Sequence, residues 1–248
     1  MSPTKNSQQT QKVPSIFLPP LIRGRFIERP NRFLGLVEIA GGTVEAFVAD
    51  PGRLEELLYP GAEVYIARSN SKQKGRRTCF DLRLVRAGRV LVSVDSRVPN
   101  ELVGKLLRLQ GLPPFAAYTD VRAEPRVASG RFDFCLRRDG QTPCYVEVKS
   151  CTLVRDGSAL FPDAPTARGA RHVRGLQELV SKGYRAAALF LVQRSDAKVF
   201  APNTVLDPDF GSAFKEATSA GVEVYAYTCN VSLERISLAK EIPVHLTV

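Results

Sequence analysis

The spacing of apolar residues changes near Pro99, and this change divides the chain into two parts that fold by different rules. From residue 21 to 95, short segments alternate apolar with polar residues, which is the period of strands buried on one face. After Pro99, helix-length and strand-length segments follow one another, and residues 186–192 form an uninterrupted apolar run typical of a central buried strand. The sequence therefore predicts a β-rich domain followed by an α/β domain.

The first domain, placed at residues 19–97, is predicted to be a small closed barrel. Gly41-Gly42 and Ala87-Gly88 supply hairpin turns, and one short helix is expected at 54–58. Several strands with one short helix in about 75 residues are typical of an OB-like barrel, a fold that commonly binds nucleic acid. Residues 1–18 are expected to be a disordered tail, because their beginning is polar and lacks the apolar stretch of a secretory signal.

The second domain, placed at residues 98–248, is predicted to be an α/β sandwich. Its first helix is expected at 100–110, with Asn100 as the capping residue and four apolar side chains on one face. Further helices are expected at 167–182 and 208–220, and strands at 121–127, 131–136, 144–148, 186–192 and 222–227.

The composition bears on the class and location of the protein. No apolar run approaches the roughly 20 residues of a membrane span. The five cysteines are an odd count without a CxxC pair, so we expect buried, reduced thiols and a cytoplasmic location. The absence of tryptophan gives a carbohydrate-binding regulator little support. No feature of the sequence assigns an oligomeric state.

The net charge of +10 is concentrated in the first domain and points to a polyanion as the partner. Residues 1–97 hold 16 Lys and Arg against 9 Asp and Glu. Clustered cations attract nucleic acid, since each phosphate contact releases a condensed counterion, whereas the alternative is a solvated loop that only aids solubility. The densest cluster includes Lys72, Lys74, Arg76 and Arg77.

Two acids and a lysine in the predicted strands carry the candidate chemistry. Glu147 and Lys149 are two residues apart, so they project from the same face of one strand, and Asp133 lies in the strand before it. Charged groups inside apolar strands are costly to desolvate, and a hard cation such as Mg²⁺ or Mn²⁺ would compensate Asp133 and Glu147. Metal-assisted hydrolysis of a phosphodiester, with Lys149 stabilising charge on phosphorus, is the reaction this set predicts. The alternative is a hairpin whose charges merely face solvent.

A cationic helix face follows this set of residues. Arg168, Arg171 and His172 fall at i, i+3 and i+4, on one side of the helix predicted at 167–182. Cations at a helix N-terminus oppose the macrodipole, so helix stability does not explain them. A phosphate bound beside the metal site would explain why these cations are there.

Several strings of residues together resemble the sugar fermentation stimulation protein A (SfsA) family from about Pro20 onwards. The strings are Asp50-Pro51-Gly52-Arg53, Arg131-Phe132-Asp133-Phe134, Tyr145-Val146-Glu147-Val148-Lys149-Ser150, and Phe161-Pro162-Asp163-Ala164 followed by Thr166, Arg168-Gly169 and His172. The resemblance implies an N-terminal OB-fold and a C-terminal domain of the PD-(D/E)XK nuclease type. It also implies DNA binding without strong sequence preference and a regulatory role in sugar (maltose) utilisation.

Carried over by position, the resemblance assigns Asp133 as the second-strand acid and Glu147 and Lys149 as the ExK pair. Glu101 and Glu124 are both candidates for a further acid. We expect backbone contacts to DNA from Arg53, from the 72–77 cluster and from the 168–172 helix face. Two functions stay open: a metal-dependent DNA nuclease, and a non-catalytic DNA-binding regulator of sugar metabolism that retains the nuclease fold. No helix-turn-helix signature supports sequence-specific repression.

Overall fold

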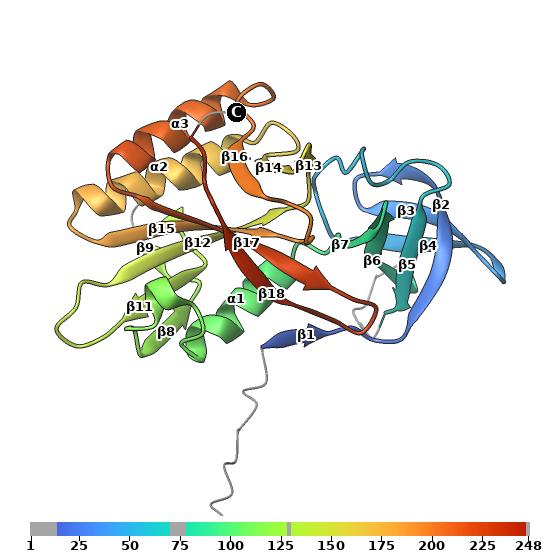
Figure 1. The fold of residues 1–248 in the computed structure, drawn as a ribbon, viewed down its shortest axis with the longest axis horizontal. Helices are drawn as coiled ribbons and strands as arrows, with labels where there is room; N and C mark the ends of the chain where they lie inside the picture. The colour runs from blue at the N-terminus through green and yellow to red at the C-terminus, as the bar shows by residue number, and fades with distance from the viewer. Residues whose placement is uncertain (1–13, 70–77, 128–129, 247–248) are drawn as a thin grey trace, which may run out of the picture.

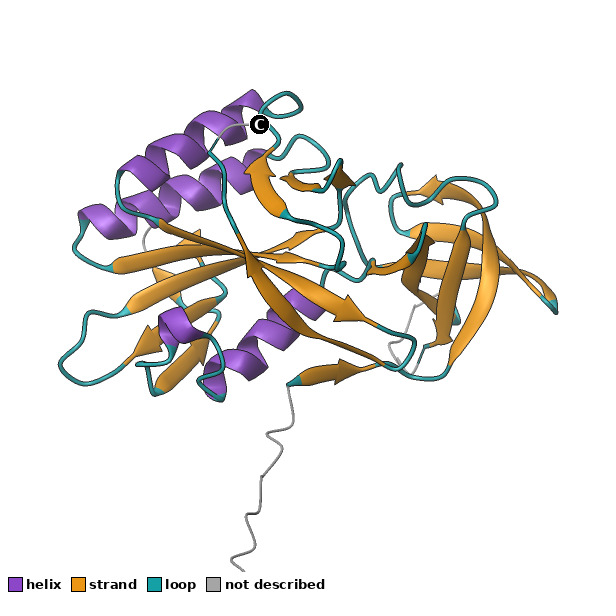
Figure 2. Ribbon diagram, viewed as in Figure 1, coloured by secondary structure: helices purple, strands orange, loops and turns teal. Residues whose placement is uncertain are grey.

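The computed structural model describes residues 14–69, 78–127 and 130–246. Figure 1 shows a barrel domain beside an α/β domain, and Figure 2 shows that the helices belong to the α/β domain. The predicted order, a β-rich domain followed by an α/β domain, is confirmed. Within these described ranges no helix is both long and apolar enough to cross a bilayer.

The first domain is a closed barrel of five strands with a sixth strand along one side. Its strands are β2 (Leu21–Asn31), β3 (Leu34–Ile39), β4 (Gly42–Val48), β5 (Glu63–Arg68), β6 (Phe80–Ala87) and β7 (Val90–Ser93). Parallel pairing of β4 with β6 closes the order β4-β3-β2-β5-β6 into a barrel. Alternate residues such as Phe26, Val37 and Val64 fill the interior, as the period of two predicts. The OB-like barrel is confirmed.

The prediction of a helix at 54–58 is wrong, because these residues form one hydrogen-bonded turn. Leu58 N donates to Leu54 O at 2.8 Å, but Leu54 has a φ of 54°. That left-handed conformation cannot belong to a right-handed helix, so the turn is not extended. The expected hairpins are present, with pairing from Ile39 to Gly42 and from Ala87 to Val90.

The second domain is a mixed seven-stranded sheet covered by helices on both faces. Its strands run in the order β1-β18-β17-β15-β12-β11-β8. These strands are β1 (Ser15–Phe17), β8 (Asp120–Ala123), β11 (Phe134–Arg137), β12 (Cys144–Cys151), β15 (Arg185–Val192), β17 (Glu223–Val231) and β18 (Arg235–Ile242). The apolar run 186–192 lies in β15, which pairs in parallel with β12 and β17, so its prediction as a central buried strand is confirmed.

The sheet separates two core regions, and the three α-helices of the described residues pack on its two faces. α1 (Val98–Arg108) packs on one face of the sheet, while α2 (Ala167–Ser181) and α3 (Pro208–Ser219) pack on the other, as Figure 1 shows. Two short sheets are also present: β9–β10 (Arg126–Val127 and Gly130–Arg131) and β13-β14-β16 (Val154–Arg155, Ser158–Phe161 and Val199–Pro202). The strands predicted at 121–127 and 131–136 are each broken, with β9 and Arg131 of β10 separated from β8 and β11, and β13-β14-β16 was not predicted. Strands of two to four residues are too short to show a period.

The expectation of a disordered tail through residue 18 is wrong for its last residues. Ser15–Phe17 form β1, which pairs antiparallel with β18 at the edge of the large sheet. Ile16 is buried there, and its packing with the core of the α/β domain explains why this segment is ordered. Residues 1–13 lie outside the described ranges. The chain thus contributes a strand to the second domain before it enters the barrel.

The barrel is packed firmly against the α/β domain. Tyr65 and Leu84 of the barrel belong to the same apolar cluster as α1 and β12. Ser93 N donates to Gln193 O at 3.0 Å, and Gln193 Nε2 donates to Asp95 O at 3.3 Å. Because these contacts fix the barrel beside the ends of β12 and β15, groups from both domains line one cavity.

Candidate functional site

The sequence predicted that Asp133 lies within a strand, but it lies at a bend immediately before β11. Its Oδ2 accepts a hydrogen bond from Val148 N of β12 at 2.7 Å, and its Oδ1 accepts one from Asn100 Nδ2 at 2.6 Å. The carboxylate is therefore fixed by two donors from two different elements. Val148 N holds it against β12, the strand that carries Glu147 and Lys149, and Asn100 links it to α1 (Val98–Arg108).

Asn100 is not the capping residue that the sequence predicted. The cap is Arg97, and Asn100 lies in the first turn of α1, where its side chain reaches Asp133. The signal for the earlier helix start is Pro99, because proline is favoured in the first helical turn. Sequence analysis thus missed Asn100 as a member of the site.

Glu147 and Lys149 project from the face of β12 that α2 covers. Glu147 is only 3% exposed, and its Oε1 accepts a hydrogen bond from Lys149 Nζ at 2.6 Å. Burial of this kind requires compensation by a partner of opposite charge, which Lys149 supplies. The structure therefore does not place these side chains on a solvated hairpin, which was the alternative interpretation.

His172 of α2 joins this pair directly. Its Nδ1 is hydrogen-bonded to Glu147 Oε1 and lies 3.3 Å from Lys149 Nζ, while Arg168 Nε donates to His172 Nε2 at 3.4 Å. Because Nε2 is the acceptor from Arg168, the hydrogen-bond network assigns the proton between His172 and Glu147 to Nδ1, which donates to Glu147. The helix face at 168–172 is thus coupled to the carboxylate of β12.

The two carboxyl groups of the site have opposite pKa shifts. Burial, followed by repulsion from Glu147, raises the pKa of Asp133, although the hydrogen bonds from Val148 N and Asn100 offset part of the rise. Burial also acts to raise the pKa of Glu147, but the hydrogen bond from His172 and the charge of Lys149 outweigh it and lower the pKa. Glu147 is therefore held ionised beside an acid whose charge is disfavoured.

The cationic face of α2 borders its own surface cavity. Arg168, Arg171 and His172 line a hollow of about 240 Å³ together with Arg131 and Phe132. The predicted i, i+3, i+4 spacing thus brings the three side chains together. The helix begins at Ala167 after Thr166, whose hydroxyl accepts a hydrogen bond from Gly169 N at 3.0 Å.

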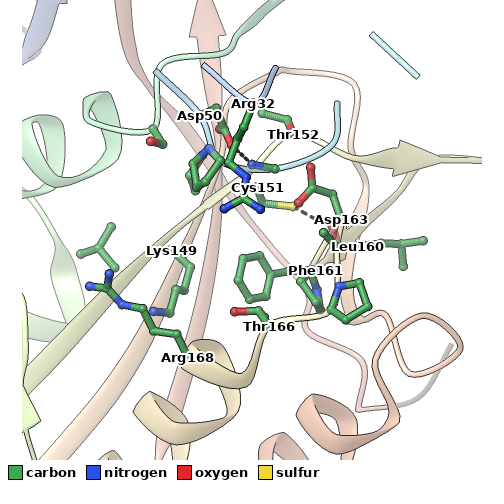
Figure 3. Close-up of a pocket in the computed structure, with 18 of the residues that line it drawn as sticks. Arg32, Asp50, Lys149, Cys151, Thr152, Leu160, Phe161, Asp163, Thr166 and Arg168 are labelled. Carbon is green, nitrogen blue, oxygen red and sulfur yellow. Dashed lines mark hydrogen bonds between the residues drawn. The ribbon is translucent and has the colours of Figure 1, made fainter. Parts of the chain in front are cut away.

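A larger cavity of about 500 Å³ lies between the two domains, and Lys149 lines it (Figure 3). On the barrel side it is bordered by the loop 50–53. Arg29 fixes this loop by donating to the carbonyl oxygens of Asp50, Gly52 and Arg53 at distances between 2.6 and 2.8 Å. Asp50, Pro51 and Gly52, three residues of one sequence motif, thus form one wall of the cavity.

On the α/β side, the same cavity is bordered by the segment 161–166. Asp163 Oδ2 accepts a hydrogen bond from Leu54 N of the barrel at 3.4 Å. The Asp163 carboxylate also lies so close to Gly52 that any Cβ at position 52 would overlap it. Two distant strings of the sequence therefore meet at the domain interface, and the contact requires glycine at position 52.

Replacing Asp50 by asparagine is expected to stabilise the protein at neutral pH. Burial, opposed by the hydrogen bond from Gly52 N and reinforced by repulsion from Asp163, raises the pKa of Asp50 to about 6. The folded state therefore holds this proton more tightly than the unfolded state, where the pKa is about 4, so stability falls as pH rises from about 4 to about 6. The gain is expected to be on the order of 3 kcal/mol at pH 7.5 and to vanish near pH 4, measured by denaturant unfolding.

A control with the opposite sign is Asp196→Asn. The hydrogen bond from Arg194 lowers the pKa of Asp196, so its stabilising effect is present at neutral pH and is lost as pH falls through the folded pKa. This variant should be less stable than the wild type at pH 7.5 and approach it in acid. A change in stability for Asp50→Asn that is equal at pH 4 and pH 7.5 would contradict the proposed titration.

Of the remaining predicted residues, Glu124 adjoins the carboxylate–lysine site (Asp133, Glu147 and Lys149) through its backbone, since Glu124 N donates to Asp133 O at 2.9 Å. Arg53 is exposed beside a second interdomain hollow. Glu101 pairs with Lys105 at 2.9 Å, and Glu124 pairs with Arg131 at 3.6 Å, each with more than half of its side chain exposed. Among the residues that the structure describes, no group of three or more His, Cys, Asp or Glu side chains is placed to hold a metal ion, so neither glutamate completes one. Lys72, Lys74, Arg76 and Arg77 lie outside the described residues.

The fold and the site define a class of protein: an OB barrel joined to an α/β domain with a buried carboxylate–lysine centre at their junction. A family profile described as "SfsA N-terminal OB domain" matches residues 27–94, and one described as "Sugar fermentation stimulation protein RE domain" matches residues 97–235. The chain therefore belongs to the SfsA family, as its sequence motifs predicted.

Individual relatives match nearly the whole chain. A sugar fermentation stimulation protein homolog of Moorella thermoacetica is 52% identical, covering 91% of this chain and 97% of its own length. A homolog of Desulforamulus reducens is 45% identical, covering 93% and 95%. The solved structure of Pyrococcus furiosus SfsA, a complex with Ca²⁺, is 29% identical with a TM-score of 0.84 and covers 93% of this chain and 98% of its own.

Proposed function

We propose that this protein binds DNA through its phosphate backbone and hydrolyses phosphodiester bonds with a divalent metal ion at Asp133, Glu147 and Lys149. The observation that carries the proposal is the contact of Glu147 with both Lys149 and His172, beside the carboxylate of Asp133 and the cations of α2. In this proposal the α/β domain has the PD-(D/E)XK nuclease fold. The family name adds a connection to sugar fermentation.

The side chains at the site fit a hard divalent cation such as Mg²⁺ or Mn²⁺. Asp133 and Glu147 are oxygen donors, and burial together with their mutual repulsion raises the pKa of Asp133, a repulsion that a cation would relieve. The solved Pyrococcus furiosus relative is a complex with Ca²⁺, also an oxygen-preferring ion. When bound, such an ion polarises a phosphoryl oxygen and lowers the pKa of bound water.

The chain's own cations have separate roles in this proposal. Lys149, fixed by Glu147, stabilises negative charge that develops on the phosphoryl oxygens. Arg168 and Arg171 bind the neighbouring phosphates and orient the strand. His172 holds Glu147 in place through a hydrogen bond that links α2 to β12.

Metal titration tests the site without relying on cleavage. We expect Mn²⁺ or Ca²⁺ to bind the wild-type protein in calorimetry, and Glu147→Gln to lose this binding because an amide is a weaker ligand than a carboxylate. Glu216→Gln, an exposed change on α3, is the matched control and should bind as the wild type does. Equal metal binding by Glu147→Gln would remove Glu147 from the site.

Affinity for DNA is expected to fall steeply with salt and to vary little with base sequence, because backbone contacts release counterions. Arg171→Ala should lower the slope of log K against log salt by about one, the value for one phosphate contact. Arg174→Ala, three residues along α2, should not change the slope, because Arg174 is paired with Asp209. Fluorescence anisotropy between 50 and 200 mM salt measures both variants, and equal slopes for wild type and Arg171→Ala would exclude that contact.

One observation favours the second candidate function, a non-catalytic DNA-binding regulator that retains this fold. Glu147 is already paired with Lys149 and His172, and the described residues offer no group of three metal-binding side chains. A protein of this kind would bind DNA with the same salt dependence and would cleave none of a panel of linear, branched and single-stranded DNAs in Mn²⁺. Cleavage by the wild-type protein, lost in the Lys149 variant discussed below, decides between the two functions.

A further inference from the structure

Charged groups line both ends of the interdomain cavity. Figure 3 shows Lys149 and Arg168 together at one end, where the cavity adjoins the carboxylate–lysine site. Asp50 and Asp163 lie toward the other end with Arg32 beside Asp50, and the two acids are close enough that the charge of Asp163 helps raise the pKa of Asp50. A ligand that fits this arrangement carries an anion at one end and both hydrogen-bond donors and an acceptor at the other.

Between these ends the cavity is lined by apolar groups that include one aromatic ring. Phe161 is half-buried, and its ring contacts Phe190 at 60° and Phe210 at 68°, so neither neighbour stacks parallel to it. Its position between Lys149 and Asp163 is visible in Figure 3. The volume of about 500 Å³ is typical of a site for a small molecule and larger than one phosphate requires.

We propose that this cavity binds one nucleotide of an unpaired DNA strand, with its phosphate at Lys149 and Arg168, its base against Phe161 and the base edge at Asp50 and Asp163. A base inside a duplex is stacked and paired on both sides, so only a single-stranded or extruded nucleotide can enter. The inference rests on the proposed function, since it names the form of DNA that the site takes. A free nucleotide has the same chemistry, and the experiment below separates the two sources.

The two carboxylates also define which bases the cavity prefers. Ionised carboxylates accept hydrogen bonds and donate none, so they match the amino group of cytosine and do not match the carbonyl oxygen at the same position of uracil. Arg32 of the barrel also lines the cavity and adds a cation from the first domain. Both domains therefore contribute to recognition of one nucleotide.

The test measures binding of 5′-dCMP and 5′-dUMP to the full chain by calorimetry in EDTA at pH 7.5. We expect dCMP to bind about tenfold more tightly than dUMP, and deoxycytidine, which lacks the phosphate, about tenfold more weakly than dCMP. A single-stranded oligonucleotide should bind more tightly than dCMP and than a duplex of the same length. Absence of dCMP binding at millimolar concentration would overturn the proposal. Tighter binding of dCMP than of the oligonucleotide would identify a free nucleotide as the ligand and overturn the DNA assignment.

Two substitutions test the placement of the base. Phe161→Leu keeps an apolar side chain and removes the aromatic face, so dCMP should bind about tenfold more weakly. The matched control is Phe17→Leu, the same change at an exposed position of β1 that does not line the cavity, which should bind dCMP as the wild type does. Asp50→Asn retains an acceptor for Gly52 N but adds a donor to the base edge, so the preference for dCMP over dUMP should disappear. An unchanged preference would remove Asp50 from base recognition.

Failure of this inference and failure of the proposed function give different results. Nucleotide binding in EDTA does not depend on a metal ion. Binding of dCMP without any DNA cleavage would therefore support the nucleotide site and contradict the nuclease proposal. Cleavage of duplex and single-stranded DNA at equal rates, without binding of dCMP, would support the nuclease proposal and contradict the nucleotide site.

Discussion

Lys149→Met is expected to lower Mn²⁺-dependent DNA cleavage at least about a hundredfold, the usual effect of removing one group that stabilises transition-state charge. Methionine has a similar length and retains the packing of the side-chain stem in a position where Lys149 is only 13% exposed. Glu147 keeps its hydrogen bond to His172, so the site is not left without a partner for the carboxylate. Single-turnover cleavage of labelled oligonucleotides measures the effect.

The control for this variant is Lys105→Met on α1, which removes an exposed lysine paired with Glu101. It should cleave at the wild-type rate. Both variants should keep most of the wild-type affinity for DNA, because other cations supply the backbone contacts. Wild-type cleavage by Lys149→Met would show that this amine has no part in the reaction and would leave the ion pair with Glu147 as a structural contact.

Phe190→Ala is expected to lower the free energy of unfolding by about 3–5 kcal/mol, the usual cost of removing a buried phenylalanine ring. Phe190 is fully buried in β15. Its ring centroid lies 4.1 Å from that of Phe200 and 5.3 Å from that of Phe161. Strands on both sides prevent the backbone from closing the space that the ring leaves. Denaturant unfolding measures the change.

The matched control is Phe17→Ala at the exposed end of β1. Phe17 is 75% exposed, so the same substitution should change the free energy of unfolding by no more than about 0.5 kcal/mol. A loss of less than about 1 kcal/mol for Phe190→Ala would mean that the core of the α/β domain is not packed as described.

Local periodicity was enough to predict most of the fold. The alternation of residues 21–95 gave the barrel strands, and the apolar run 186–192 gave β15, because burial on one or both faces leaves its pattern within a single segment. The same reasoning placed Glu147 and Lys149 on one face of β12. Spacing of three and four residues likewise grouped Arg168, Arg171 and His172 on α2.

The rest depends on contacts between segments far apart in the chain, which no local period encodes. Asn100 looked like a helix cap, but its role follows from the distance between α1 and the bend at Asp133. The contact of Asp163 with Gly52 depends on how the two domains are docked. The turn at Leu54 was predicted to be a helix because leucine rarely adopts a left-handed φ, so the local sequence did not indicate one there.

The position of β1 has a consequence for how the protein is made. During synthesis the barrel leaves the ribosome well before β18, the strand with which β1 pairs. Ser15–Phe17 must therefore wait without a partner while the nascent chain completes the sheet, and they join it in one of the last steps. A shortened gene product that begins at the barrel would leave the backbone of β18 open along one edge, which is a template for self-association between molecules.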